Sequence, residues 1–197
     1  MRSVHRTADE FTKALDRVRS VEVRPEFVLD ESPAPQRLAP QAVALTVESR
    51  DLDIQDSSGR FVLLHDPDGV PEWEGNFRAV VFVRSAIESD LIGDSMIQEV
   101  SWSWLKEALD DVGAQYLQLG GTVTCNSGQS FGSMSDRPSE GFVEIRASWT
   151  PTSRDDNPVS QLMDRHVMAW LDLMVNAAGL LPIPRGIETV GSGKNRS

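Results

Sequence analysis

The stretch RFVLLHDPDGVPEWEGNFRAVVFVR, residues 60–84, decides the fold class. Residues 77–84 place apolar side chains on one face and two arginines on the other, the period of a half-buried strand, and a strand is also predicted over Arg60–His65. Residues 66–69, DPDG, are typical of a turn, because proline presets one dihedral angle and glycine accepts a positive one. Residues 43–48 alternate in the same way and precede this pair. Three antiparallel strands are therefore predicted.

The segments on either side of these strands differ in character. Residues 24–40 contain four prolines, which lack amide donors and restrict the residues before them, so this segment is predicted to be an extended connector. Two more strands are predicted over Gln115–Thr124 and Phe142–Trp149, joined by a long polar connection. The sequence therefore predicts five strands.

Three helices are predicted, over residues Thr7–Ser20, Ser95–Gly113 and Asn157–Gly179. The first two open with a capping box, in which Thr or Ser is followed three residues later by Glu or Gln. The third opens with an Asn cap and Pro158 in the first helical position, and Pro182 follows its end. Apolar residues recur at helical spacing in all three, which predicts one buried face for each.

This order, α-β-β-β-α-β-β-α, predicts an α+β protein with a five-stranded, mainly antiparallel sheet and helices packed on one face. Residues 1–190 are expected to form a single domain, and residues 191–197, rich in Gly and Ser, a disordered tail. The element order looks like that of the small acidic secretion-chaperone fold, whose members bind partner proteins as dimers. That analogy concerns element order, and fold alone does not fix function.

The composition limits the classes of function. With 30 acidic and 19 basic residues the net charge is −11, so direct binding to nucleic acid is disfavoured, because phosphate binding needs clustered cations. One Cys and three His allow no internal disulfide and no structural zinc site, and no metal or cofactor is expected. No apolar run approaches the roughly 20 residues that span a bilayer, and no signal peptide is recognised. We therefore expect a cytoplasmic location and no membrane association.

One motif points to nucleophilic catalysis. Residues 128–132, GQSFG, have the spacing of a hydrolase nucleophile elbow, with Ser130 as nucleophile and His166 as the corresponding base. An elbow needs a strand before it and a helix directly after it, but residues 133–141 read as a loop. We therefore assign no catalytic residue and keep the loop 125–141, with Ser130 and His166, as the alternative site for a small ligand or a hydrolytic reaction.

Two tryptophans are candidates for a partner-binding surface. Trp102 lies about 120° from the middle of the apolar face of its helix, and Trp73 stands among acidic residues in a turn-rich segment. Exposed tryptophan is enriched at protein interfaces. The alternative is that each packs over an edge of the sheet within the monomer.

Several stretches together resemble an uncharacterised actinobacterial family, domain of unknown function 3000, over about residues 7–188. They are residues 37–40 (RLAP), 59–69 (GRFVLLHDPDG), 100–105 (VSWSWL), 119–124 (LGGTVT), 144–151 (EIRASWTP) and 177–182 (AAGLLP). The resemblance implies a single domain and brings no catalytic residues. Genes of such families often lie near one for a ribonuclease D-like exonuclease, which implies a link with RNA metabolism.

The sequence thus supports one hypothesis and one alternative. The hypothesis is a non-enzymatic, acidic, cytoplasmic protein-binding module, chaperone-like or accessory, that associates with a protein partner or with itself as a dimer. Any link with RNA metabolism would run through that partner. The alternative is a small-ligand binder or hydrolase that uses the loop 125–141.

Overall fold

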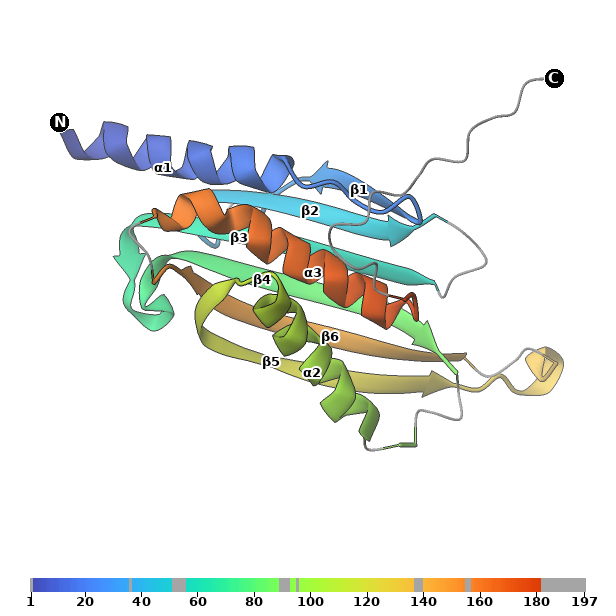
Figure 1. Cartoon of the computed structure of the whole chain (residues 1–197). Coiled ribbons are helices and arrows are strands. Elements are labelled where there is room, and N and C mark those ends of the chain that lie inside the picture. The colour runs from blue at the N-terminus through green and yellow to red at the C-terminus, as the bar shows by residue number, and fades with distance from the viewer. Residues whose placement is uncertain are drawn as a thin grey trace, which may run out of the picture.

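The computed structural model describes residues 2–35, 37–50, 56–88, 93–94, 96–136, 140–154 and 157–181. Its centre is one six-stranded sheet in the order β1-β2-β3-β4-β6-β5, and every neighbouring pair is antiparallel (Figure 1). The strands are β1 (Phe27–Ser32), β2 (Gln41–Ser49), β3 (Ser57–Val70), β4 (Gly75–Ile87), β5 (Gln115–Gly128) and β6 (Glu140–Thr152).

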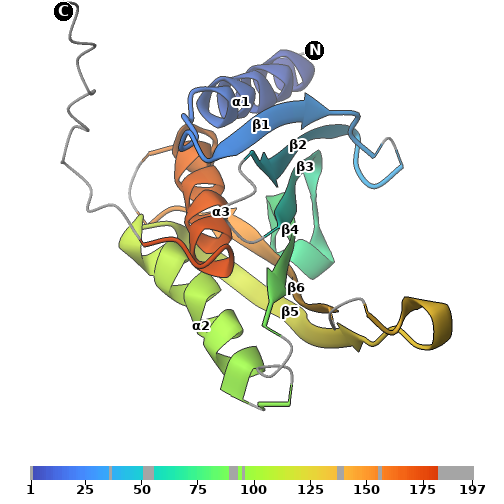
Figure 2. The same ribbon diagram turned by 90° about the vertical axis from the view of Figure 1, so that its right-hand side faces the viewer.

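Three α-helices lie on the same side of this sheet, as Figure 2 shows, namely α1 (Arg2–Arg19), α2 (Met96–Asp111) and α3 (Met163–Ala177). Short 3-10 helices are η1 (Pro71–Trp73), η3 (Gly132–Met134) and η4 (Val159–Leu162). The helix α1 packs against α3 and η4, and α2 packs against α3 and β5. Among the described residues, no helix is both long enough and apolar enough to cross a lipid bilayer.

The prediction of five strands is wrong, because the segment taken as a connector contains β1. The observed order of helices and strands along the chain is α-β-β-β-β-α-β-β-α. Prolines 25 and 33 stand outside the strand, so the residues between them keep every amide that the ladder with β2 requires. A short edge strand therefore lies between these prolines. The sequence interpretation takes the same prolines as evidence against a strand.

Several helix boundaries also differ from the predicted ones. The helix α1 begins at Arg2, so the expected capping box at Thr7 lies inside it. The expected cap Ser95 lies outside the described residues, and the side chain of Asp94 accepts a hydrogen bond from the amide of Met96 at 2.8 Å. After Pro158 the chain first forms η4, and α3 begins only at Met163. The predicted helix ends at Gly113 and Gly179 are confirmed, and both glycines have a positive φ.

The core lies between the helices and the inward face of the sheet. Ten residues of α3 are buried, including Trp170, which contacts Phe61 of β3 with ring centroids 5.7 Å apart. Close approach of α3 requires Gly59, because a Cβ there would lie 2.6 Å from the sulfur of Met174. The alternation predicted for β4 and β6 is confirmed. Its buried side chains are Phe77, Ala79, Val81, Val83, Val143, Ile145, Ala147 and Trp149.

The outward face of the sheet carries no α-helix among the described residues, yet it is not uniformly open. Ala44, Val62 and Leu64 form a small second cluster, which residues of the β1–β2 connection and Trp73 cover. Farther along, arginines contact aromatic rings, with Arg84 4.0 Å from the centroid of Phe142. This face is therefore partly covered on one side and solvated on the other.

Candidate functional site

The free edge of β5 is the most unusual surface of the molecule. The strand β5 pairs with β6 along one side and with no other described strand, so its other side presents main-chain amides and carbonyls. Residues 112–135 contain no Asp, Glu, Lys or Arg, although a quarter of the chain is charged. Sheet proteins commonly protect such edges with charged side chains, prolines or short strands. We call Gln115–Gly128 the β5 edge.

The helix α2 runs beside β5 (Figure 1). Trp102 of α2 contacts β5 at Gly121. The side chain of Trp102 is half-buried and packs against the core. A Cβ on Gly121 would lie 2.9 Å from Cζ3 of the Trp102 ring and would also meet the carbonyl oxygen of Arg146. The neighbouring Gly120 has nothing within 4 Å of its Cβ position. Gly121 therefore lets the indole ring lie directly on the edge strand.

Exposed hydrophobic side chains stand at both ends of β5. Leu117, near its start, is 45% exposed, and Phe131 and Met134, in and beside η3, are 72% and 47% exposed. At the start of the strand the pairing with β6 shifts between Leu117 and Gly120, and Gln118 has a positive φ of 49°. This bulge leaves the stretch from Gly120 to Gly128 in regular register with β6.

The two tryptophans that the sequence singled out do not form one surface. Trp73 lies in η1, packs on the outward cluster of Ala44, Val62 and Leu64, and accepts a hydrogen bond at its carbonyl from Thr150. Trp102 packs on the opposite, helix-covered side of the sheet. Both are half-buried within the monomer. Of the two, only Trp102 lies at the β5 edge.

Nor does the structure bring Ser130 and His166 together. Ser130 follows β5, near the tip of the β5–β6 hairpin, whereas α3, which holds His166 in its first turn, begins at the opposite end of the sheet (Figure 1). His166 is fully buried, and its Nδ1 accepts a hydrogen bond from Nε1 of Trp149 at 3.0 Å. Burial, with a smaller contribution from Arg165, lowers the pKa of His166 to about 3. A neutral, buried imidazole of this kind is a packing residue and no base for Ser130.

Two other titratable residues, His65 and Cys125, are also packing residues. His65 is buried between Phe11 and Phe77, with its Nδ1 2.7 Å from Oε1 of Gln41, and burial lowers its pKa. Burial raises the pKa of Cys125, so this residue stays a thiol at neutral pH and is a weak nucleophile. Among the described residues, no group of three or more His, Cys, Asp or Glu could hold a metal ion.

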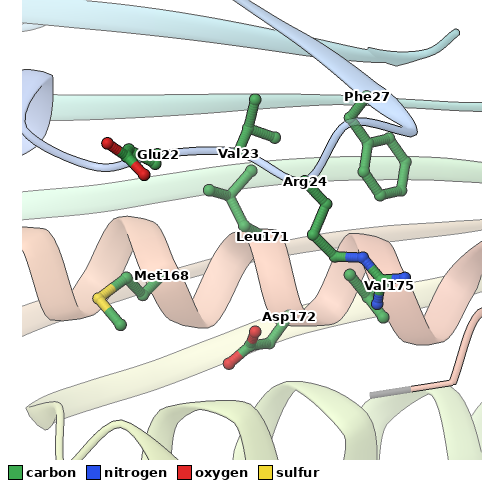
Figure 3. A pocket seen from close by; sticks show the side chains of 8 residues that line it. All are labelled: Glu22, Val23, Arg24, Phe27, Met168, Leu171, Asp172 and Val175. Carbon is green, nitrogen blue, oxygen red and sulfur yellow. The ribbon is translucent and has the colours of Figure 1, made fainter. Parts of the chain in front are cut away.

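A small pocket of about 130 Å³ lies between α3 and the segment that joins α1 to β1 (Figure 3). Its apolar lining comes from Val23, Phe27, Met168, Leu171 and Val175, with Glu22, Arg24 and Asp172 also contributing. The guanidinium of Arg24 is already bound to Glu26 and donates to the carbonyl of Leu181 at 2.9 Å. The pocket can hold an apolar group, but its cation is engaged within the chain.

Sequence reasoning missed the β5 edge, although part of its signal was visible. The absence of charge between residues 112 and 135 can be read directly from the sequence. What could not be read is that β6 lies between β4 and β5, which places β5 outermost. Two adjacent glycines in a strand indicate that another group approaches the backbone closely. They do not show whether Gly120 or Gly121 contacts the Trp102 ring.

The fold and this edge define an α+β protein with one helix-covered face and one long, uncharged edge strand. The chain belongs to the family described as protein of unknown function (DUF3000), whose model matches residues 7–188. Comparisons with curated proteins and with solved structures found no match. The family assignment brings no activity with it.

Proposed function

We propose that this protein is a non-enzymatic protein-binding module, chaperone-like or accessory, that takes up an extended protein segment at the β5 edge. In this mode the segment adds a strand to the sheet, and main-chain hydrogen bonds provide the affinity. The observation that carries the proposal is the long edge strand without charged residues beside Trp102. A partner strand also covers the exposed side chains of Leu117 and Phe131 at its two ends.

The energetics of strand addition favour this edge. Each main-chain hydrogen bond contributes about 1 kcal/mol net, so a segment pairing over several residues offsets much of the entropic cost of association. No charged side chain has to be desolvated along Gln115–Gly128, and the half-buried indole of Trp102 offers apolar surface beside the strand. Specificity then comes from the side chains that flank the edge.

The charge of the chain argues for a protein partner. At a net charge of −11 the molecule repels polyanions, so a role in RNA metabolism would operate through that partner. In this proposal the protein acts in the cytoplasm, where the single Cys125 remains a free thiol.

Capture of partners from an extract of the native cell tests the proposal. The informative variant is Thr124→Lys, because Thr124 is exposed on β5 and faces Glu144 of β6, which accommodates a lysine. Edge lysines block strand addition. We expect the wild-type chain to recover a recurrent protein near equimolar amount and the variant to recover at least tenfold less.

The matched control is Thr46→Lys, which makes the same change on the same face of the sheet but in the interior strand β2, between Asp30 and Arg60. It should capture as the wild-type chain does. Trp102→Ala should also weaken capture while the domain stays folded. Equal recovery with Thr124→Lys and wild type, or recovery of the bait alone, would contradict binding at this edge.

A further inference from the structure

We infer that one occupant of the β5 edge is a second copy of this chain, paired antiparallel through β5 about a two-fold axis near Thr124. The inference rests on the proposed function of this edge and names the partner that satisfies it. Two six-stranded sheets then join into one continuous sheet, with all helices on one side. Such a contact is isologous, so each strand must complement itself.

Charge is the first reason for self-pairing. Two copies each carrying a net charge of −11 repel one another over most of their surfaces. The charge-free run of residues 112–135 includes the whole of β5, so the strand itself brings no like charges together. Two carboxylates of other elements lie beside it and are already bound within the chain: Glu144 of β6 to Arg146 at 3.1 Å, and Glu74 to Gln118 at 2.6 Å. Antiparallel pairing there requires no counter-charge from a partner.

The positions of the exposed hydrophobic side chains give the second reason. The stretch in regular register with β6, Gly120–Gly128, is centred on Thr124, and the exposed Leu117 and Phe131 lie beyond its two ends. An antiparallel pair centred on Thr124 therefore brings the Leu117 end of each copy to the Phe131 end of the other. A two-fold contact thus covers both hydrophobic ends of β5 at once, in both copies.

The flanking helix adds to this contact. Trp102 lies on Gly121, three residues from the proposed axis, and is only half-buried in the monomer. A second strand laid along the edge would extend the surface beneath the ring, and the same contact would repeat in the other copy. Trp102 therefore serves the interface and the monomer fold together.

The oligomeric state of the full chain is the first test. At about 100 μM, where an interface with a dissociation constant of about 1 μM is almost fully occupied, sedimentation equilibrium should give twice the 21.8 kDa chain mass. Thr124→Lys should give the mass of one chain, because two lysines then face each other at the axis, whereas Thr46→Lys should remain a dimer. A wild-type chain that sediments as 21.8 kDa would overturn the inference.

Disulfide trapping tests the axis itself in a Cys125→Ser background. Opposed residues of an antiparallel pair have Cα atoms about 4.5–5.5 Å apart, which a disulfide can bridge. Thr124→Cys should therefore cross-link two copies on mild oxidation. Thr122→Cys and Asn126→Cys should not, because each lies two residues from the axis and about 13 Å along the strand from its own copy. A maximum at either of these positions, or no cross-link at all, would overturn the Thr124 axis.

The two proposals fail differently. If the wild-type chain is monomeric but captures a different protein that Thr124→Lys loses, the edge binds proteins and the second copy is not its occupant. If the wild-type chain neither dimerises nor captures a protein through this edge, both proposals fail.

Discussion

The two edges of the sheet, β1 and β5, are built from the same kind of backbone but are protected very differently. The strand β1 has six residues, includes Asp30 and Glu31, and lies between prolines 25 and 33. The strand β5 has 14 residues and no charge. On β1, Glu31 forms an ion pair with Arg19 of α1 at 2.9 Å.

This difference indicates which edge of so acidic a protein can accept another chain. Short length, charge and prolines make β1 a poor template for pairing, as expected for an edge that must stay single. The long uncharged β5 carries a bulge near Leu117 and the Trp102 ring of α2, but no charged side chain. Breaking or exchanging these features should therefore change stability at one edge and association at the other.

The largest effect is expected at Gly121 in β5. Gly121→Val places a side chain against the Trp102 ring and the Arg146 carbonyl, and should lower the free energy of unfolding by about 3 kcal/mol. The matched variant Gly120→Val should change it by less than about 1 kcal/mol, because nothing lies within 4 Å of that Cβ position. Urea unfolding measures both. Equal losses would show that Gly121 is not closely packed against the backbone of β6 and the Trp102 ring.

An intermediate effect on the free energy of unfolding is expected from the two buried histidines, His65 in β3 and His166 in α3. The pKa of His166, beside Trp149 of β6, is lowered to about 3, whereas an unfolded histidine has a pKa of about 6.5. The unfolded chain therefore binds the proton first, and stability present above about pH 6.5 is lost as the pH falls. The expected slope is about 1.4 kcal/mol per pH unit for this group.

His166→Gln isolates that contribution, because the amide oxygen can still accept from Trp149. Unfolding in urea at pH 7.5, 6.5 and 5.5 should show a flatter pH dependence for the variant than for the wild-type chain. The same measurement on His65→Gln tests the second buried histidine, because burial also lowers the pKa of His65. Its pH dependence should be flatter than that of the wild-type chain as well. An unchanged slope in His166→Gln would mean that His166 gains a proton in the folded protein.

The smallest effect is expected at the protected edge. Arg19 holds the pKa of Glu31 below its ordinary value, but both side chains are about half exposed, so solvent screens the pair. Arg19→Gln should lower the free energy of unfolding by about 0.5 kcal/mol, and the loss should disappear at about 1 M salt. Its mass by sedimentation should equal that of the wild-type chain. A change in oligomeric state would show that β1 takes part in an interface, and would contradict the claim that only β5 accepts another chain.

The elements that sequence reasoning located best are those with long, regular patterns. The apolar positions expected along the last helix, from Met163 to Ala178, are buried, and the alternation of β4 is confirmed. Boundaries were harder, because a capping box such as Thr7–Glu10 can also occur inside a helix. The strand β1 was missed because its six residues carry too little pattern to outweigh the surrounding prolines.

Patterns in the sequence were enough to identify the α+β class, the antiparallel pairing of residues 60–65 with 77–82, the acidic charge and the uncharged run of residues 112–135. The predicted turn at residues 66–69 is wrong, because these residues belong to β3 and η1 (Pro71–Trp73) joins β3 to β4. That the uncharged run forms an edge strand follows from the packing of distant segments. The order of strands depends on which neighbour buries more apolar surface, and β6 lies between β4 and β5. The same packing laid Trp102 on Gly121 and separated Ser130 from His166, because contacts between distant segments form only when the whole core does.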